Sequence, residues 1–323
     1  MEYPDFDGEV FELVVEKEYD GWRVDKLLSQ YREDLSRSYI QKLIDEGRVL
    51  VEGKKVKTGF KVSNNLRIQV YLPPLKELLI EPENIPLDIL YEDEDVILIN
   101  KGKNMVVHPA VGHYSGTLVN ALLYHCKGKL SGINGVLRPG IVHRIDRNTT
   151  GVIVVCKNDR AHQALSEQLK LHSITRKYNA LVHGSFKEKS GRIEGAIGRH
   201  PIDRKKMAIN EKNGKPAVTH YTVLENFGSQ YAHIECQLET GRTHQIRVHM
   251  ASINHPLLGD EVYGRGKNLF SLEGQALHAR VLGFLHPTTK NYMEFEAPLP
   301  EYFSTLISRL RRVGGEGNEA KSY

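Results

Sequence analysis

The chain has 323 residues, a length typical of about two domains. Hydrophobic residues make up 40% of it and charged residues 26%, values that exclude a wholly disordered chain, a collagen-like repeat and a coiled-coil rod. The formal net charge of +4 indicates no particular partner until its distribution along the chain is examined.

The charge falls into blocks. Residues 22–75 contain 11 basic and 6 acidic residues, and residues 138–250 contain 19 basic and 10 acidic ones. The stretch 76–104 between them is acidic, with 3 basic and 8 acidic residues. Basic blocks attract polyanions such as nucleic acids, although two solvent-exposed basic faces would give the same counts.

The sequence is typical of a cytosolic protein. Its three cysteines, Cys126, Cys156 and Cys236, are widely spaced and indicate neither a disulfide framework nor a zinc ribbon. The N-terminal segment is acidic and lacks the parts of a signal peptide. Because no apolar run approaches the roughly 18 residues of a membrane span, we expect a cytoplasmic chain that is not inserted in a membrane.

Residues 22–72 have the pattern of a small α/β unit. Apolar residues recur at helical spacing over 24–28, and Ser36 can cap a second helix that Gly47 ends. Short strands are predicted at 48–53, 54–59 and 66–72.

The second helix of this unit carries two cations, Arg37 and Lys42. Four lysines follow it in the sequence: Lys54, Lys55, Lys57 and Lys61. We expect this side of the unit to bind phosphates, although a solvent-exposed helix and a basic hairpin fit the pattern equally well.

A proline-rich segment marks the best domain boundary. Residues 73–87 contain four prolines and separate two differently patterned regions. We therefore predict a small unit at 12–75, a linker at 76–87 and a larger unit at 88–305. The end of a helix and a mobile, Gly-rich tail are predicted for 306–323.

The larger unit is predicted to contain more strands than helices. The predicted strands are 89–95, 96–101, 151–157, 177–184, 219–226, 231–239 and 291–297. The predicted helices are 115–126, 159–172 and 243–252. Because the two kinds do not alternate regularly, the pattern favours an α+β fold with a central, largely antiparallel mixed sheet, and not a doubly wound fold.

Several common motifs are absent from the sequence. There is no GxxxxGK[ST] phosphate loop, no complete GxGxxG fingerprint, no HExxH pair and no GxSxG elbow. His244 and His249 are five residues apart and so lie on different faces of a helix, which disfavours a metal site. No metal is predicted.

The segment RPGIVHRIDRNTTGVIVVCK, residues 138–157, brings a polar turn to the head of an apolar strand. Such a turn is a good place for a rigid catalytic side chain. Asp146 lies there between Arg144 and Arg147, which would keep it ionised and available as a nucleophile or base. A salt-bridged surface turn is the alternative.

The segment 238–264, LETGRTHQIRVHMASINHPLLGDEVYG, is a second polar group. Thr243 is predicted to cap a short helix. Arg247 then lies about one turn into it, on the face opposite Ile246 and Val248. A basic surface helix is the alternative.

A third group is RKYNALVHG, where Tyr178 begins a strand directly after Arg176 and Lys177. An aromatic ring beside cations suits stacking on a nucleic-acid base. A tyrosine that closes the edge of a core would give the same pattern.

Together these segments resemble the RluA/RluD-type family of RNA pseudouridine synthases. The resemblance spans most of 88–290 in the family's order, and its blocks are 106–123, 138–155, 174–184, 198–209, 214–221, 241–264 and 275–289. Residues 22–72 also resemble the S-four RNA-binding domain that precedes the catalytic domain in many members, a less specific match because that domain is short and widespread.

The resemblance implies an α+β catalytic domain with an RNA-binding cleft that isomerises uridine to pseudouridine without a metal or organic cofactor. The family's catalytic aspartate, active-site tyrosine and aspartate-pairing arginine fall on Asp146, Tyr178 and Arg247. Its base-flipping arginine falls on Arg144, and Leu277 matches an apolar residue of the pocket.

We expect further residues to bind the RNA substrate: His143, Arg147 and His244 near the catalytic turn, and Arg37 and Lys42 in the small unit. The resemblance is incomplete at three places. Lys101-Gly102-Lys103-Asn104 stands where a Lys-Pro-Ala-Gly turn is common, Arg147-Asn148 where Lys-Asp is common, and Gly274 where arginine is frequent.

The combination of the two domains favours large-subunit ribosomal RNA as the substrate, with transfer RNA as the nearest alternative. A non-catalytic RNA-binding protein of ribosome assembly would not need the Asp146, Tyr178 and Arg247 trio. A carboxylate glycosidase requires two acids, and only Asp146 stands out. We expect a cytoplasmic monomer whose acidic stretch, 76–104, faces away from the RNA.

Overall fold

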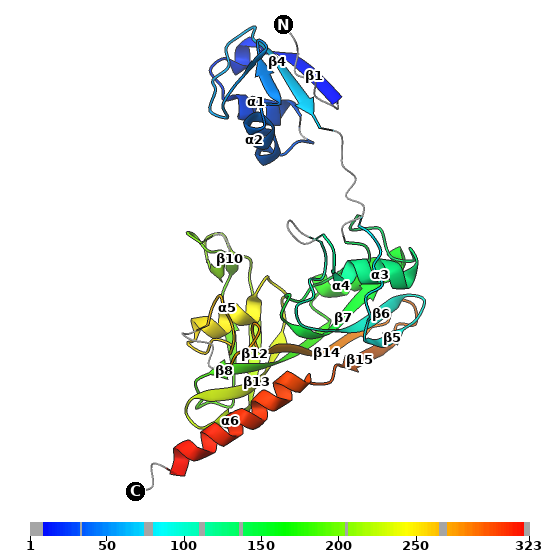
Figure 1. Cartoon of the computed structure of the whole chain (residues 1–323), viewed down its shortest axis with the longest axis vertical. Coiled ribbons are helices and arrows are strands. Elements are labelled where there is room, and N and C mark those ends of the chain that lie inside the picture. The colour runs from blue at the N-terminus through cyan, green and yellow to red at the C-terminus, as the bar shows by residue number, and fades with distance from the viewer. Residues whose placement is uncertain are drawn as a thin grey trace. The chain divides into compact units, whose positions relative to one another are not determined.

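In this computed structural model the described residues are 9–32, 34–73, 80–109, 114–135, 138–203, 206–264 and 270–319 (Figure 1). For residues 315–319 only the backbone is described. The chain divides into two compact units, Met1–Glu77 and Leu78–Tyr323. The beginning of the predicted linker, 76–79, and the end of the predicted tail, 320–323, lie outside the described residues.

The first unit is a small sheet with two helices against it. Its elements are β1 (Glu9–Val14), η1 (Lys17–Tyr19), α1 (Val24–Tyr31), α2 (Arg37–Asp45), β2 (Val49–Val51), β3 (Lys54–Lys55) and β4 (Arg67–Leu72). The strands pair antiparallel in the order β1-β4-β2-β3. The predicted ends of α2 are confirmed: the Ser36 side chain accepts from the Tyr39 N–H at 3.3 Å, and Gly47 follows the helix with φ +71°.

The second unit is built on one large sheet. Its strands are β5 (Ile89–Glu92), β6 (Val96–Lys101), β7 (Thr150–Cys156), β8 (Thr175–His183), β9 (Ser190–Glu194), β10 (Ile197–Arg199), β11 (Met207–Ile209), β12 (Val218–Phe227), β13 (Tyr231–Leu238), β14 (Leu277–Leu285) and β15 (Tyr292–Glu296). Its helices are α3 (Leu118–Cys126), α4 (Asp159–Lys170), α5 (Gln245–Ser252) and α6 (Glu301–Glu319).

Nine strands form the central sheet, and two more form the separate hairpin β10–β11. The sheet order is β5-β6-β7-β14-β8-β13-β12-β9, with β15 paired to β14. Within this sheet only β7 and β14 run parallel, so the sheet is mixed and largely antiparallel. The predicted α+β class is confirmed.

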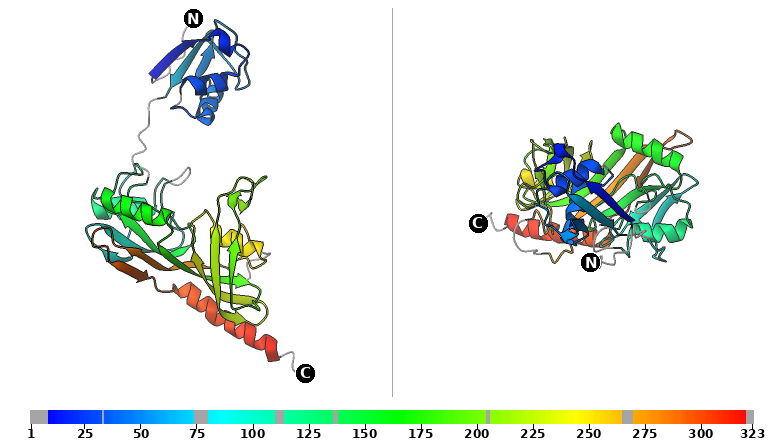
Figure 2. Two further views of the ribbon diagram at one scale, coloured as in Figure 1. Left: turned by 180° about the vertical axis from the view of Figure 1, so that it is seen from behind. Right: turned by 90° about the horizontal axis from the view of Figure 1, so that it is seen from above.

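The alternation of side chains along each strand divides the core between two faces of the sheet. In β6 and β7, Ile97 and Ile153 pack with α3, whereas Leu98 and Val154 pack with α4. In β8 and β13, alternate residues likewise pack with α5 on one side and with α6 on the other. Figures 1 and 2 show α6 running along the sheet, away from α5. The face that carries α4 and α5 is the one that holds the pocket described below.

The acidic stretch 76–104 is tied into this fold. Glu92 in β5 accepts from Lys157 and pairs with His125, each at 2.8 Å. Asp95 accepts from Arg160 at 3.1 Å. These carboxylates at the β5–β6 edge of the sheet therefore have intramolecular partners. That this stretch faces away from RNA stays a prediction.

That the C-terminal tail is mobile stays a prediction. Within the stretch 306–323, α6 continues to Glu319. Gly314 allows this, because a Cβ there would lie 2.7 Å from the Phe227 carbonyl carbon at the end of β12. A glycine in the helix thus lets α6 approach the β12–β13 turn closely, an effect that composition alone does not reveal. In the described part of the chain, no helix is long and apolar enough to cross a membrane.

Gly151 fixes the junction between β7 and β14. Its φ is +109°, and a Cβ there would lie 2.1 Å from the Ala279 carbonyl oxygen. We predict that Gly151→Ala lowers the free energy of unfolding of the larger unit by about 2–5 kcal/mol, because backbone strain and overpacking add. Denaturant titration measures this loss.

Gly116→Ala is the matched control for this substitution. Gly116 also has a positive φ, +67°, but nothing lies within 4 Å of its added Cβ. Gly116→Ala should lower the free energy of unfolding only by the backbone strain, about 1–2 kcal/mol. Equal losses for the two variants would contradict a close contact at Gly151.

Candidate active site

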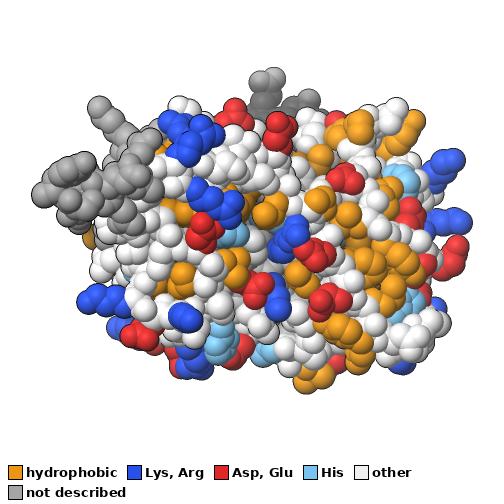
Figure 3. All heavy atoms as spheres, turned by 90° about the horizontal axis from the view of Figure 1, so that it is seen from below, with side chains coloured by type: hydrophobic (Ala, Val, Ile, Leu, Met, Phe, Trp, Pro, Cys, Tyr) orange, Lys and Arg blue, Asp and Glu red, His pale blue; other side chains and the backbone are white. Residues whose placement is uncertain are grey.

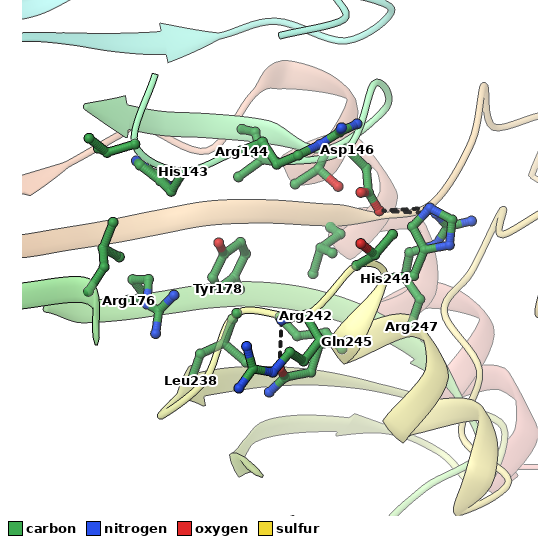
Figure 4. A pocket seen from close by; sticks show the side chains of 18 of the residues that line it. His143, Arg144, Asp146, Arg176, Tyr178, Leu238, Arg242, His244, Gln245 and Arg247 are labelled. Atoms are coloured by element: carbon green, nitrogen blue, oxygen red, sulfur yellow. Dashed lines mark hydrogen bonds and ion pairs between the residues drawn. The ribbon is translucent and has the colours of Figure 1, made fainter. Parts of the chain in front are cut away.

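A pocket of about 420 Å³ opens on the α4–α5 face of the sheet, between the turn 142–149, the end of α4, β8 and the start of α5 (Figure 4). It brings together seven of the residues that the sequence singled out: His143, Arg144, Asp146, Tyr178, His244, Arg247 and Leu277. Arg147 does not line it. Arg37 and Lys42 belong to the other unit.

The centre of the pocket is one guanidinium group shared by two carboxylates. Arg247 donates from Nε and Nη2 to the two oxygens of Asp260, at 2.7 and 2.9 Å. Its Nη1 donates to Asp146 Oδ2 at 3.0 Å. Burial opposes the charge of Arg247, but the two carboxylates raise its pKa above the usual value. The forked pair fixes the plane of the guanidinium, and with it the direction from which Asp146 is held.

Asp260 is itself fixed by its backbone surroundings. Its side chain is fully buried, and Oδ1 also accepts from the Val262 and Tyr263 N–H groups, at 2.9 and 3.0 Å. Burial tends to raise the pKa of this carboxyl, yet Arg247 and the two N–H groups lower it overall. Asp260 lies in the polar segment 238–264, but its sequence context indicates no role for it. A carboxylate 13 residues from a cation gives no local signal of pairing.

Arg247 is 6% exposed, and Ile246 and Val248 are buried beside it, so the alternative of a basic surface helix is wrong. Asp260 supplies the buried counter-charge of Arg247. One expectation about this helix was also wrong. Thr243 was expected to cap the helix, but the helix starts after His244, which adopts a left-handed conformation with φ +57°.

The flanking arginines are not the partners of Asp146. In the described residues Asp146 forms an ion pair with Arg247, and its Oδ2 lies 3.8 Å from Nε2 of His244. Arg144 extends from the turn as an exposed side chain whose Nη1 lies 3.3 Å from His108 Nε2. The side chain of Arg147 is also exposed. The carboxylate is therefore oriented from α5 and not by its sequence neighbours.

Two of the three histidines that line the pocket, His143 and His244, are held in neutral forms. His143 Nε2 accepts from the Val154 N–H at 3.1 Å, and burial lowers its pKa to about 3. This contact anchors the catalytic turn to β7. His244 Nδ1 contacts the Tyr263 hydroxyl at 2.9 Å, and burial lowers its pKa despite the nearby carboxylates. Their roles in substrate binding stay predictions.

Tyr178 and Leu277 form the apolar floor. They are 8% and 4% exposed and share a core cluster with Ile145 and Ile246. Burial raises the pKa of Tyr178, so its phenol is neutral at ordinary pH. The floor thus offers a flat aromatic ring and a branched aliphatic side chain beside a carboxylate.

Lys101 is a further buried charge that the sequence analysis noted only as part of a loop. It is 1% exposed and donates from Nζ to the carbonyls of Gly102, Met105 and Arg147, at 2.7, 3.1 and 3.0 Å. Burial lowers its pKa to about 7, partly opposed by Asp146. Lys101 therefore ties the residue after Asp146 to the end of β6.

In the first unit, Arg37 is held by a buried carboxylate. Asp25 accepts from Arg37, Arg23 and Gln41, and its pKa is lowered by these donors against burial. Lys42 pairs with Glu46 at 3.6 Å and is mostly exposed. Five helical positions separate Arg37 from Lys42, which puts them on different sides of α2.

No group of three or more His, Cys, Asp or Glu residues suited to a metal ion occurs among the residues described. The three cysteines are free and buried.

We predict that Lys101→Met destabilises the larger unit. The methionine keeps most of the volume but leaves three carbonyls without their donor, at about 1–3 kcal/mol for each one stranded. The stability advantage of wild type over the variant should grow as the pH rises from 7 to 10.5. In that range the unfolded chain carries a proton on Lys101 that the folded chain does not, so the wild-type free energy of unfolding gains a positive slope with pH that the variant lacks.

Denaturant titrations at pH 7 and pH 9.5 measure both effects. Lys290→Met is a control, because Lys290 lies in the exposed turn between β14 and β15. An unchanged stability in Lys101→Met would show that the three carbonyls do not need this donor.

Comparison with known proteins agrees with this geometry. Residues 95–252 match the family model described as RNA pseudouridylate synthase, and residues 22–68 match that of the S4 domain. The chain is 50% identical to the uncharacterized RNA pseudouridine synthase YlyB of Bacillus subtilis over 303 residues, 94% of this chain and 99% of that protein. It is 45% identical to ribosomal large subunit pseudouridine synthase D of Zymomonas mobilis over 309 residues, 93% of this chain and 97% of the relative.

Among solved structures, human RNA pseudouridylate synthase domain containing 1 has a TM-score of 0.54 and 27% identity, covering 71% of this chain and 96% of its own. The similarity to the two bacterial relatives extends over both units of the chain. The stretch that matches the synthase model includes the turn with Asp146, the Tyr178 strand and the Arg247 helix. The chain belongs to the RNA pseudouridine synthases, enzymes that are isomerases.

Proposed function

We propose that this chain converts a uridine of large-subunit ribosomal RNA to pseudouridine, with Asp146 as the catalytic carboxylate. The observation that carries the proposal is the Asp146–Arg247–Asp260 network beside the Tyr178 ring in one pocket. The relatives named as ribosomal large subunit pseudouridine synthase D support the choice of RNA. Such a substrate implies work in the cytoplasm.

The target uridine must leave its base stack before its glycosidic bond can be reached, at a cost of a few kcal/mol. Arg144 is suited to fill the vacated space, because it is exposed beside the pocket and two residues from Asp146. The flipped uracil would stack on Tyr178 and contact Leu277. Both side chains are buried in the core and keep one orientation.

Asp146 is then the group next to the reacting bond. It would act as a nucleophile, at the ribose or at the uracil, or stabilise charge while the bond to nitrogen 1 breaks. Arg247 holds the carboxylate in one direction during these steps. Stacking and the enclosed floor keep the freed uracil in place until carbon 5 joins the ribose. Isomerisation needs no other reactant.

The two units divide the work in this proposal. Residues 12–75 would bind RNA, with Arg37 oriented by Asp25, and residues 88–305 would carry out the chemistry. Transfer RNA is the alternative substrate. Mapping pseudouridines in ribosomal and transfer RNA from cells with and without the gene decides between the two.

Asp146→Asn should abolish isomerisation while RNA binding survives. The amide keeps the size of the side chain but lacks the charge, so the rate should fall by at least about 10²–10⁴-fold, the range for a positioned acid or base. The measurement is single-turnover pseudouridine formation, with binding followed separately. Glu188→Gln makes the same charge change at an exposed position that does not line the pocket. Normal turnover in the Asp146→Asn enzyme would refute the assignment.

Arg247→Lys should lower kcat more than it changes KM. A lysine is a point charge and cannot bridge Asp260 and Asp146 as the planar fork does. Loss of one charge-assisted hydrogen bond, about 1.5–3 kcal/mol, corresponds to about 10–100-fold in rate. Steady-state kinetics measures the change, and thermal unfolding checks that the variant folds. Near-normal kcat in a folded variant would show that Asp146 does not depend on this contact.

A further inference from the structure

The pocket has a second end that the proposed chemistry does not use. Arg176 lies on β8 two residues before Tyr178 and on the same face, about 7 Å along the strand. Figure 4 shows its side chain on the other side of Tyr178 from Arg247. The lining of the pocket also contains Lys170, His172 and Arg242.

Arg176 is buried with too few partners. It is 6% exposed, and its Nη2 donates to the Glu239 carbonyl at 2.9 Å. Its Nε is buried without a hydrogen-bond partner, and among the described residues no carboxylate lies within ion-pair distance of it. A Cβ on Gly241 would lie 2.6 Å from Nη1, so the chain passes closely over the guanidinium at a position without a side chain. An unpaired buried charge of this kind is strongly unfavourable.

The surroundings of Arg176 add to its charge and do not neutralise it. Burial, together with Arg242, lowers its pKa. Asp146 is the one acidic residue among those that line the pocket, and it is already bound to Arg247. By contrast, the face in Figure 3 carries Lys and Arg interspersed with Asp and Glu. Among the described residues, the cationic end of the pocket therefore has no anionic partner of its own.

We propose that Arg176, with Arg242 beside it, binds a backbone phosphate of the RNA next to the flipped uridine. This proposal rests on the proposed function, because RNA is the polyanion that would enter the pocket. A guanidinium suits the task, since its fork matches two phosphate oxygens. The Nε and Nη groups that do not donate to the Glu239 carbonyl are available for these phosphate oxygens. Phosphate binding would thereby satisfy the donor that is stranded in the free enzyme.

The test is the salt dependence of RNA binding by the full chain. The probe is an unmodified transcript of large-subunit ribosomal RNA, titrated over a range of KCl concentrations with wild type, Arg176→Gln and Arg176→Lys. Loss of one phosphate contact should reduce the slope of log K against log[KCl] by about 0.7, the value for a single strand. Affinity of Arg176→Gln at low salt should fall about 10-fold, while Arg176→Lys should keep most of the slope.

Arg311→Gln is the matched control. It makes the same change in charge, but Arg311 pairs with Glu225 and lies on α6, on the face of the sheet opposite the pocket. Its slope should equal that of wild type. An unchanged salt slope in a folded Arg176→Gln variant would overturn the proposal. This holds even if the affinity falls, because Arg176 would then contact the uracil and not a phosphate.

A second measurement does not depend on the glutamine variant folding. The probes are short RNAs with one uridine, in which an uncharged methylphosphonate replaces the phosphate either 5′ or 3′ of that uridine. One of the two should bind wild type more weakly than the parent RNA. Part of this penalty should be lost in Arg176→Lys, because lysine keeps the charge that sets the salt slope but lacks the fork that pairs with two phosphate oxygens. Equal penalties in both proteins would overturn the proposal. Failure of the proposed function would give a different result. Wild type would then form no pseudouridine in the transcript, whatever the salt slope of its binding.

Discussion

The active site depends on a guanidinium group that is shared between two carboxylates inside the protein. Arg247 gives Nε and Nη2 to Asp260 and Nη1 to Asp146, so each of its three nitrogens donates to a carboxylate. A buried ion pair is stable only when its remaining lone pairs and protons are also satisfied. Here the backbone N–H groups of Val262 and Tyr263 complete the shell of Asp260. The stretch 260–263 is therefore as much part of the site as the turn with Asp146.

The sheet brings these segments together. β14 lies between β7 and β8, parallel to the first and antiparallel to the second. This insertion places the turn before β7 and the start of β8 on one face, beside α5. Gly151 permits the close approach, because its missing side chain leaves room for the Ala279 carbonyl. A strand from residues 277–285 thus positions a carboxylate that lies about 130 residues earlier in the chain.

The sequence predicted those parts that depend on local pattern. All three helices expected in the larger unit are present as α3, α4 and α5, and the cap at Ser36 is confirmed. The strand at 277–285 was quoted as a motif but not predicted as a strand, because it alternates poorly and is buried between neighbours on both sides. Burial of Arg247 could not be foreseen either. A cation looks like a surface residue until its partner is known, and Asp260 becomes that partner only through the fold.

The same burial gives a physical reason for the anionic substrate that we propose. Removal from water keeps Tyr178, His143 and His244 neutral, so these side chains contribute shape and hydrogen bonds but no charge. Guanidinium groups do not lose their protons under such conditions, and Arg176 and Arg247 remain cationic. Asp146 and Asp260 both bind Arg247, and among the described residues no carboxylate pairs with Arg176. A low-dielectric pocket with this imbalance gains most from a ligand that carries its own negative charge close to a flat, stackable ring. A nucleotide within an RNA strand has both.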